Sequence, residues 1–437
     1  ASDGDFMISK TKGAWSVAAL VKDNEVDSAM NALVTETQRV KQFGFTPSEY
    51  DRARINVLKQ YESLYNDRDK QRNSTFTKEY VRHFTEGGYI PGIETEYALI
   101  GQLAQAVPVE QVNKYIQDMI GDTNIVISLT GPEKEGLSYP TDEELLRDFM
   151  KAQQIPVEPY RETLSDEPLI PSLPAPGKIT ESKEDPLFGA TVLTLSNGIK
   201  VVLKHTDFKK DEIQMTATSP GGSTLFGNKD IDNLKVFNEV IELGGLGNFS
   251  ATDLGKMLAG KKVSCSTSLG LDSENVNGSS TPSDLKTLFE LIYLSFTAPR
   301  MDEESYASFE NRMKAQLKNL ELNPMVAFSD SLTKAIYNNN PRAMRIDPAD
   351  FKNISYPRIM EMYKERFGDA SGFVFTFVGN IDTDSIRPLV EQYLATLPAN
   401  GKIEQGNPKQ VPAIRKGDYV NRFKRQMETP KASVVNF

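Results

Sequence analysis

The chain carries few side chains whose type and position could perform chemistry, and its only histidines are His83 and His205. Histidine can act as a general base or bind a metal, because its pKa lies near neutral pH. His83 lies within a helical pattern and His205 ends a predicted strand, so a structural or surface role is favoured over catalysis for both. Cys265, the only cysteine, lies in an alternating run that indicates a small buried side chain rather than a reactive thiol. We therefore predict no catalytic residue in the chain.

Three further patterns resemble functional motifs but favour structural roles. Residues 255–261 nearly match the phosphate-binding pattern GxxxxGK, yet Lys262 replaces the hydroxyl residue that would bind magnesium, and no strand directly precedes the pattern. The glycine-rich turn at 244–247 is interpreted as a helix terminator rather than a ligand cradle. Glu303 and Glu304 lie at a helix start, where negative charge favours the dipole, so a catalytic carboxylate pair is not expected.

The composition is that of an ordinary globular chain. Its 437 residues suggest about three domains, and 39% hydrophobic residues are enough to build their cores. A formal net charge of -10 argues against nucleic acid as a partner, because binding to phosphates needs a concentrated positive field. No run of about 18 apolar residues predicts a membrane span. The opening residues lack an initiator Met and the features of a signal peptide, so we expect a processed or excised chain.

The elements that position these residues are divided by a proline-rich segment. Seven prolines lie between residues 155 and 190, among acidic and small residues. Proline fixes its own backbone and restricts the preceding residue, so this stretch should run extended and resist helix formation. It is interpreted as part of a long, semi-stiff linker.

Upstream of this segment, the pattern predicts a strand, several helices and a closing strand. The apolar run at 14–21 suits a buried strand. Thr46-Pro47-Ser48-Glu49 supplies a capping box with proline at the first helical position, so a long helix should follow. Further helices are expected at 24–43, 94–106 and 109–120, and a strand at 124–130.

Downstream, the first signal is a hairpin. Apolar strands at 191–195 and 199–203 flank Ser196-Asn197-Gly198, and Asn-Gly readily adopts the positive backbone angles of a tight turn. A third strand is expected at 211–219, helices at 284–297, 303–320 and 356–367, and a last strand at 373–378.

The two halves resemble each other. One aligned pair of segments is GFTPSEYDRARINVLKQ and PRMDEESYASFENRMKAQLK, in which Tyr50 occupies the same position as Tyr306. In a second aligned pair, the Gly-Asp pair that starts at Gly121 occupies the same position as the one that starts at Gly368. We therefore predict an α+β fold with two homologous modules, each a mainly antiparallel sheet packed with several helices. The first copy lacks its opening hairpin, and the proline-rich linker joins the two copies.

Several segments together support a family resemblance. The hairpin LTLSNGIKVVLK, the helix GFTPSEYDRARINVLKQYE, the segment YVRHFTEGGYIPGIETE and the turn ELGGLGNFS occur in this order. Together they resemble the insulinase or pitrilysin (M16-like) family of zinc metallopeptidases, especially its long bacterial members. The resemblance covers nearly the whole chain, and it implies a metallopeptidase M16-like (LuxS-like) fold in four homologous domains whose two halves are joined by an extended linker.

The resemblance also implies domain boundaries. Residues 1–135 correspond to an N-terminally truncated second domain and residues 136–189 to the extended, proline-rich linker. Residues 190–400 correspond to a third domain, and residues 401–437 to the start of a fourth. The chain is thus expected to be an internal fragment of a longer protein.

The family's chemistry requires zinc, held by two histidines of an H-x-x-E-H helix and a later glutamate, with the motif's own glutamate activating water. Neither histidine of this chain lies in such a motif. In the third-domain copy the equivalent helix should fall near residues 231–243, where Asn233, Lys235 and Phe237 take the approximate places of the ligands. None of the three is a usable zinc ligand there, so the resemblance implies a degenerate copy, no metal site in this chain, and zinc in the absent first domain.

Two functions remain open. In the first, the chain is the non-catalytic middle portion of a zinc metallopeptidase, supplying chamber wall, hinge linker and sheet edges on which a peptide substrate could add as a strand. In the second, the parent has lost catalysis and acts as an assembly or peptide-binding protein of the same fold. Expected partners are unfolded peptides and the other domains of the parent chain. The resemblance to bacterial members implies a periplasmic location, and the substrate-binding residues are unknown.

Overall fold

A computed structural model describes residues 2–9, 12–21, 23–131, 136–162, 167–320, 323–424 and 432–435. The chain forms two compact units. Unit 1 comprises residues 1–166 with the short segments 209–211 and 256–262, and unit 2 comprises the remainder. In the described part of the chain, no helix combines the length and apolar character that crossing a membrane demands.

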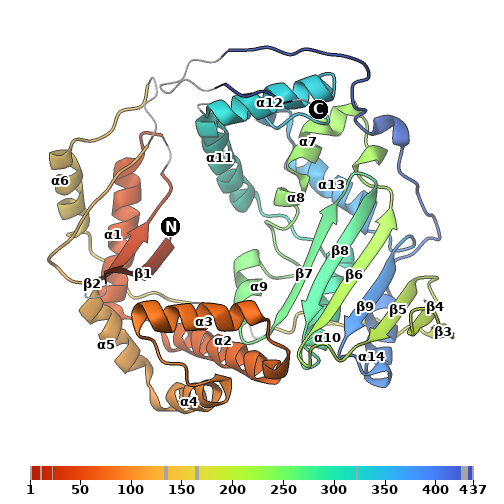
Figure 1. Ribbon diagram of the computed structural model, residues 1–437, viewed down its shortest axis with the longest axis horizontal. Helices are drawn as coiled ribbons and strands as arrows, with labels where there is room; N and C mark the ends of the chain where they lie inside the picture. The colour runs from red at the N-terminus through yellow and green to blue at the C-terminus, as the bar shows by residue number, and fades with distance from the viewer. Residues whose placement is uncertain are drawn as a thin grey trace. The chain divides into compact units, whose positions relative to one another are not determined.

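Unit 1 is mainly helical (Figure 1). A hairpin of β1 (Ser2–Ser9) and β2 (Lys12–Ala18) precedes the helices. The helices are α1 (Val26–Phe43), α2 (Pro47–Asn66), α3 (Asn73–Glu86), α4 (Ile93–Ala106), α5 (Val109–Met119) and α6 (Asp142–Ala152). Helix α2 packs against α4, and α1 packs against α5 and α6.

The start of α2 follows directly from its sequence. The Thr46 side chain accepts a hydrogen bond from the Glu49 backbone N–H, and the Glu49 carboxylate accepts one from the Thr46 N–H at 2.8 Å. This reciprocal capping box satisfies two of the backbone donors that a helix start leaves unpaired. Gly44, with a φ of 70°, separates α2 from α1.

The predicted strand at 124–130 is wrong. These residues form no regular element, and Val126 is 89% exposed. The apolar pattern is strand-like, but among the described residues no strand lies beside the segment to complete a hydrogen-bonded ladder. A strand needs such a partner, because its backbone groups cannot be satisfied within the strand itself. The strand expected at 14–21 forms, but it starts earlier and ends at Ala18 as β2.

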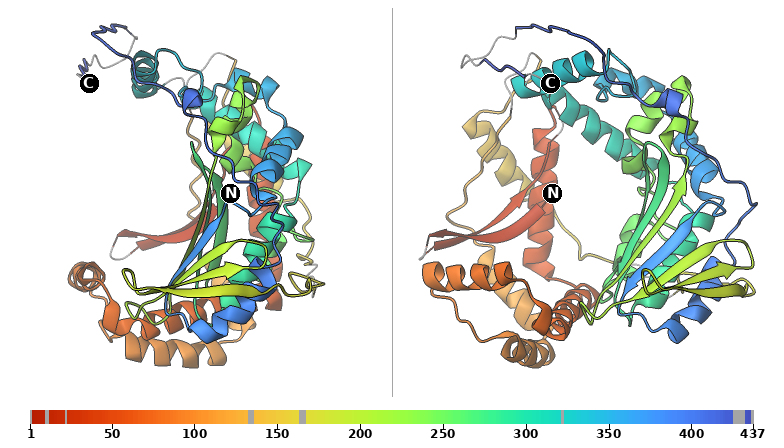
Figure 2. Two further views of the ribbon diagram at one scale, coloured as in Figure 1. Left: turned by 90° about the vertical axis from the view of Figure 1, so that its right-hand side faces the viewer. Right: turned by 45° about the vertical axis from the view of Figure 1, so that its right-hand side comes forward.

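Unit 2 is built on a seven-stranded sheet with the order β3-β4-β5-β9-β6-β8-β7 (Figures 1 and 2). The strands are β3 (Ile179–Asp185), β4 (Ala190–Leu195), β5 (Lys200–His205), β6 (Ile213–Pro220), β7 (Val263–Leu269), β8 (Ser273–Ser280) and β9 (Val374–Gly379). Only the pairing of β5 with β9 is parallel. The predicted α+β fold with a mainly antiparallel sheet is therefore confirmed, as is the hairpin at Asn197-Gly198, where Gly198 has a φ of 84°.

The longer helices of this part of the chain are α9 (Ala251–Met257), α10 (Leu285–Thr297), α11 (Glu303–Leu320), α12 (Pro324–Ile336), α13 (Tyr356–Phe367) and α14 (Thr383–Leu389). Helix α10 packs on β7 and β8, and it also contacts α13. Phe289 of α10 stacks on Phe377 of β9 with ring centroids 5.1 Å apart, and both side chains are fully buried. This aromatic contact joins the helical layer to the centre of the sheet.

In its described residues, the segment predicted as an extended linker contains two regular elements. Helix α6 lies within residues 136–189, and it starts at a second capping box formed by Thr141 and Glu144. Strand β3 pairs with β4 at one edge of the sheet. Elsewhere the described residues between 155 and 190 contain no helix, in keeping with their proline content.

The helices of the two units follow the predicted correspondence. Tyr50 and Tyr306 each occupy the fourth position of their helices, α2 and α11. The Tyr50 hydroxyl donates to the Val107 carbonyl, just before α5, and Tyr306 stacks at 4.7 Å on Tyr356, which begins α13. Each tyrosine thus ties its helix to the start of a later, equivalent helix, which agrees with two copies of one unit.

Candidate functional site

The helix expected at 231–243 in unit 2 is split. Helix α7 (Ile231–Lys235) and helix α8 (Phe237–Val240) are separated by Val236, whose φ of -120° and ψ of 6° leave the helical region. Val236 and Phe237 are both 1% exposed. The expectation of one continuous helix is therefore wrong, because the chain breaks where two consecutive side chains enter the core.

The three residues expected near the ligand positions all have structural roles. The Asn233 side chain is buried and accepts a hydrogen bond from the Ser355 backbone N–H at 2.9 Å, just before α13. The Lys235 ammonium contacts Asp232 and Asp350, each at 3.0 Å. Phe237 belongs to the hydrophobic core.

A zinc ion does not fit this set of side chains. Burial lowers the pKa of Lys235, but hydrogen bonds with Asp350 and Asp232 outweigh burial and raise it above the usual range, so the side chain stays cationic. A fixed ammonium repels a divalent cation. The Phe237 side chain has no lone pair for a metal, and the Asn233 side-chain oxygen already accepts a hydrogen bond from the backbone. Within the described ranges, no three His, Cys, Asp or Glu side chains gather in a way that could hold a metal.

Helix α8 and the turn after it occupy the edge of the sheet at β7. Asn238 accepts a hydrogen bond from the Leu269 N–H at 2.8 Å and donates one to the Leu269 carbonyl at 3.2 Å. The Glu242 carboxylate accepts a hydrogen bond from the Thr267 N–H at 3.1 Å. Asn238 of α8 and Glu242 of the turn after it therefore bind alternate residues of β7.

These side chains close the C-terminal half of the β7 edge. Strand β7 is last in the sheet, and Thr267 and Leu269 direct their backbone groups away from β8 toward Glu242 and Asn238. A peptide that added as a strand here would have to displace both side chains, because the same donors and the same carbonyl would have to serve it. The expectation that sheet edges accept a peptide is therefore corrected for this half of β7.

Opening the edge has a measurable consequence. In the double variant Asn238→Ala and Glu242→Ala, we expect a loss of about 1–2 kcal/mol in the free energy of unfolding, because the exposed strand groups lose their partners. We also expect self-association, because an open edge pairs with other chains. Analytical ultracentrifugation and urea unfolding measure both effects. Glu239→Ala, which changes an exposed neighbour in α8, is the matched control, and a double variant that stays as monodisperse as this control would contradict the edge-closing role.

A cavity of about 240 Å³ lies beside this closed edge, within unit 2. Its walls include Ile231, Leu234 and Lys235 of α7, together with Leu269, Leu271 and Arg342. The cavity thus combines aliphatic surface with two cationic side chains. No sequence pattern indicated it, because its walls come from four separate stretches of the chain.

The two histidines take structural places. The His83 ring contacts the Gly88 carbonyl through Nδ1 near the end of α3, and its residue is exposed. The His205 Nδ1 lies 2.9 Å from the Ile381 carbonyl at the end of β5. Cys265 packs against the core of unit 2, and burial raises the pKa of its thiol to about 12, which suppresses the reactive thiolate.

The remaining motif-like patterns are also structural. Gly255 lies inside α9, so residues 255–261 do not form a loop between a strand and a helix, and the geometry of a phosphate-binding loop is absent there. A Cβ at Gly244 would lie 2.0 Å from the Arg300 carbonyl oxygen, which explains a glycine in this tight turn. Asp302 accepts a hydrogen bond from the Ser305 N–H at 2.9 Å at the start of α11, and this bond lowers the pKa of the Asp302 carboxyl.

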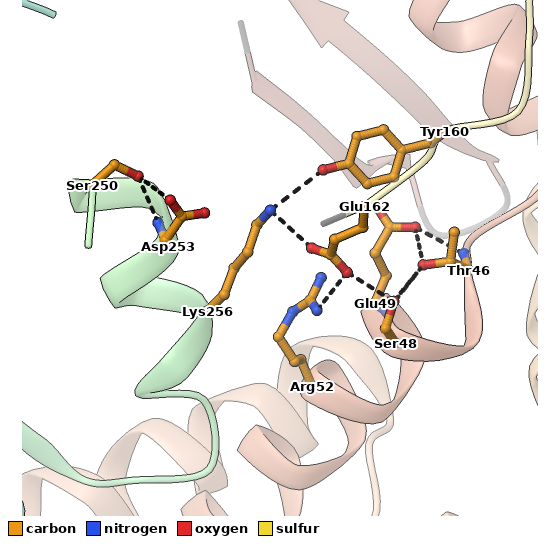
Figure 3. A network of polar contacts seen from close by, with 9 residues as sticks. All are labelled: Thr46, Ser48, Glu49, Arg52, Tyr160, Glu162, Ser250, Asp253 and Lys256. Carbon is orange, nitrogen blue, oxygen red and sulfur yellow. Dashed lines mark hydrogen bonds and ion pairs between the residues drawn. The ribbon is translucent and has the colours of Figure 1, made fainter. Parts of the chain in front are cut away.

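A second polar cluster, in unit 1, was not predicted (Figure 3). The Glu162 carboxylate has a side-chain exposure of only 4% and contacts Arg52 at 2.8 Å, Lys256 at 2.9 Å and the Ser48 hydroxyl at 2.8 Å. Burial raises the pKa of Glu162, but the hydrogen bonds from Arg52, Lys256 and Ser48 outweigh it and lower the pKa to about 2. A carboxylate held ionised by two cations is a poor proton acceptor, so this cluster is structural.

Comparison with known sequences points to one family. A family model described as the Peptidase M16 inactive domain matches residues 353–435. The chain is 26% identical over 365 residues to the zinc protease PQQL-like of Arabidopsis thaliana, covering 82% of this chain and 35% of that protein. It is 20% identical over 384 residues to the probable zinc protease PqqL of Escherichia coli, covering 86% of this chain and 40% of that protein.

Solved structures share the fold. The ferredoxin protease FusC, solved in complex with Arabidopsis ferredoxin, matches with a TM-score of 0.57 and 19% identity, covering 92% of this chain and 45% of that chain. The periplasmic protease PqqL of Escherichia coli matches with a TM-score of 0.51 and 18% identity, covering 87% of this chain and 42% of that chain. The chain spans less than half the length of each of these relatives.

Proposed function

The chain is a relative of the insulinase-type (M16) zinc proteases, and from this premise we propose that it is the non-catalytic middle portion of such a protease. One observation carries the proposal. The positions near which a zinc ligand set would lie are taken by Asn233, Lys235 and Phe237, each of which serves the packing of unit 2. The match to an inactive-type M16 domain supports the same conclusion.

We propose that the chain contributes to the wall of a substrate chamber formed with the other domains of its parent. Residues 1–135 would be most of the second domain, 136–189 the linker, 190–400 the third domain and 401–437 the start of the fourth. The division into two compact units supports this arrangement, and so does coverage of less than half of each relative. Because part of the β7 edge is closed, substrate contacts in the third domain would have to use other surfaces.

Catalysis would then occur outside this chain. Zinc in the absent first domain would polarise the peptide carbonyl and activate water, and the residues described here would bind and confine the substrate. Peptides or unfolded proteins are the proposed substrates, in line with the protein partner of FusC. A periplasmic location is proposed from the similarity to the periplasmic PqqL of Escherichia coli.

The proposal is tested by comparing this 437-residue chain with its full-length parent. We expect the isolated chain to bind no stoichiometric zinc and to leave unfolded peptide substrates intact, because its third-domain site lacks ligands. We expect the parent to contain zinc and to hydrolyse the same peptides. Zinc is measured by atomic emission spectroscopy and hydrolysis by mass spectrometry of the products.

The outcomes separate the two functions. Stoichiometric zinc or hydrolysis in the isolated chain would overturn the proposal. A parent without an H-x-x-E-H motif, without zinc and without hydrolysis would instead fit an assembly or peptide-binding protein of the same fold.

A further inference from the structure

The cavity beside the closed β7 edge has the chemistry of an anion site with apolar walls. Aliphatic side chains of Ile231, Leu234, Leu269 and Leu271 form much of its surface, Arg342 supplies positive charge and Lys235 supplies a hydrogen-bond donor. No carboxylate is among the described residues that line it. Its volume of about 240 Å³ is below the range of about 300–1,000 Å³ typical of small-molecule pockets, so it suits one residue rather than an extended segment.

Arg342 provides charge that its neighbours do not neutralise. Its guanidinium donates to the Gln410 side chain at 3.1 Å, to the Ser223 carbonyl at 3.2 Å and to the Phe226 carbonyl. All three acceptors are neutral, and across the residues with described positions no ion pair involves Arg342. Burial lowers the pKa of this guanidinium, as expected for a charge held away from water without a counter-ion.

Lys235 plays a different part. The two carboxylates of Asp232 and Asp350 outnumber its single positive charge, so it adds a hydrogen-bond donor to the cavity but no net positive charge. The two carboxylates also fix the position of its ammonium at the wall formed by α7. An anion between the two side chains would gain one uncompensated cation and one oriented donor.

The closed edge limits what can enter. The outward N–H and carbonyl of Leu269 are bonded to Asn238, so an extended peptide cannot continue past the cavity by pairing with this part of β7. The C-terminus of a peptide does not need to pair with this part of β7, because no residue follows its terminal carboxylate. The site therefore suits a peptide terminus better than the middle of a peptide.

We propose that this cavity binds the C-terminal carboxylate of a peptide whose last residue is aliphatic. The carboxylate lies against Arg342 and Lys235, and the terminal side chain lies among Leu234, Leu269 and Leu271. This inference rests on the proposed function in one respect, namely that the ligand is a peptide. It requires neither zinc nor hydrolysis.

Binding by the full 437-residue chain tests the inference. Isothermal titration calorimetry compares a short acetylated peptide ending in leucine, with a free carboxylate, with the same peptide amidated at its C-terminus. We expect the amide to bind about tenfold or more weakly, because it forfeits a charge-assisted hydrogen bond. An amidated peptide ending in glutamate separates a terminal carboxylate from a side-chain carboxylate, and we expect it to bind as weakly as the leucine amide.

Two variants place the site. Arg342→Gln should weaken the free-acid peptide about tenfold or more, because it removes the uncompensated charge. Arg415→Gln is its matched control, since Arg415 also donates to neutral acceptors, Ala335 and Asn338, but lies outside the cavity. Leu271→Glu serves if the first variant fails to fold, because Leu271 is 45% exposed and a carboxylate there would compete for Arg342. Leu187→Glu, at an 81% exposed position, controls for added surface charge.

Three results would overturn the inference. The acid and the leucine amide could bind equally well, the glutamate amide could bind as tightly as the acid, or no peptide could bind at all. A folded Arg342→Gln variant that binds like Arg415→Gln would also overturn it. These failures differ from failure of the proposed function, which would appear as zinc or hydrolysis in the isolated chain whatever the peptide terminus.

Discussion

Replacing Asp230 by asparagine is expected to lower the free energy of unfolding of unit 2 by about 2–4 kcal/mol, because it removes one partner of a buried ion pair. Asp230 lies immediately before α7, and its side chain is 5% exposed. Its two oxygens accept hydrogen bonds from Arg358 of α13 at 3.1 and 3.2 Å. This bond is the main cause of the raised pKa of Arg358. An asparagine amide would turn donor hydrogens toward the guanidinium.

The same arginine supplies the control. Glu361 contacts Arg358 at 3.3 Å but is 67% exposed. A pair so open to water contributes less than about 1 kcal/mol, so Glu361→Gln should change stability little. Hydrogen exchange across α7 and α13 locates the effect, and we expect faster exchange there only in Asp230→Asn. Equal stability losses in the two variants would show that burial of the carboxylate does not decide its contribution.

Local signals predicted much of the fold. The capping box at Thr46 and Glu49, the Asn197-Gly198 turn and the helical spacing of 303–320 and 356–367 all appear in the structure where the sequence indicated them. Each depends on residues within a few positions of one another, so its energetics can be evaluated without the rest of the chain. The same holds for the poor fit of Lys235 and Phe237 to a metal site, since residue type alone decides it.

Features that depend on distant partners were not predictable. The segment 124–130 has the composition of a strand, but strand formation also requires a neighbour, which no local pattern reveals. Asn238 in α8 and Glu242 in the turn after it are ordinary polar residues in the sequence, and only the fold brings β7, about thirty residues later, beside them. Glu162 pairs with Arg52, which lies far upstream in the sequence, and with Lys256, which lies far downstream.

On the proposed domain assignment, the closed edge and the cavity distinguish residues 190–400 from a catalytic domain. A metal centre needs anionic or neutral donors around an open position. In this chain the corresponding region holds the cations Lys235 and Arg342, and α8 directs Asn238 onto the neighbouring strand. Arg342 has no ion-pair partner among the described residues, and Lys235 already binds Asp232 and Asp350, so this region offers the cavity hydrogen-bond donors rather than the lone pairs that a metal cation needs.

Replacing Glu162 by glutamine is expected to destabilise unit 1 by about 2–3 kcal/mol near neutral pH, because Arg52 and Lys256 would keep their charges without the carboxylate that pairs with them. The folded-state pKa of Glu162, about 2, lies below the ordinary value of 4.5. The native state therefore favours the ionised form, and this contribution is fully present above about pH 4.5. It is lost as the pH falls toward 2. The stability difference between the wild type and Glu162→Gln should accordingly shrink through that window.

Urea unfolding at pH 6 and pH 3 tests this expectation, with Trp15 as the reporter. Trp15 is the only tryptophan and lies in β2, so its fluorescence follows unit 1. Glu36→Gln is the matched control in the same unit, because Glu36 also pairs with an arginine, Arg39, but is 65% exposed. An exposed pair of this kind contributes less than about 1 kcal/mol, so this variant should track the wild type at both pH values. A stability difference for Glu162→Gln that stays constant between pH 6 and pH 3 would mean that the lost interaction does not depend on the ionised carboxylate.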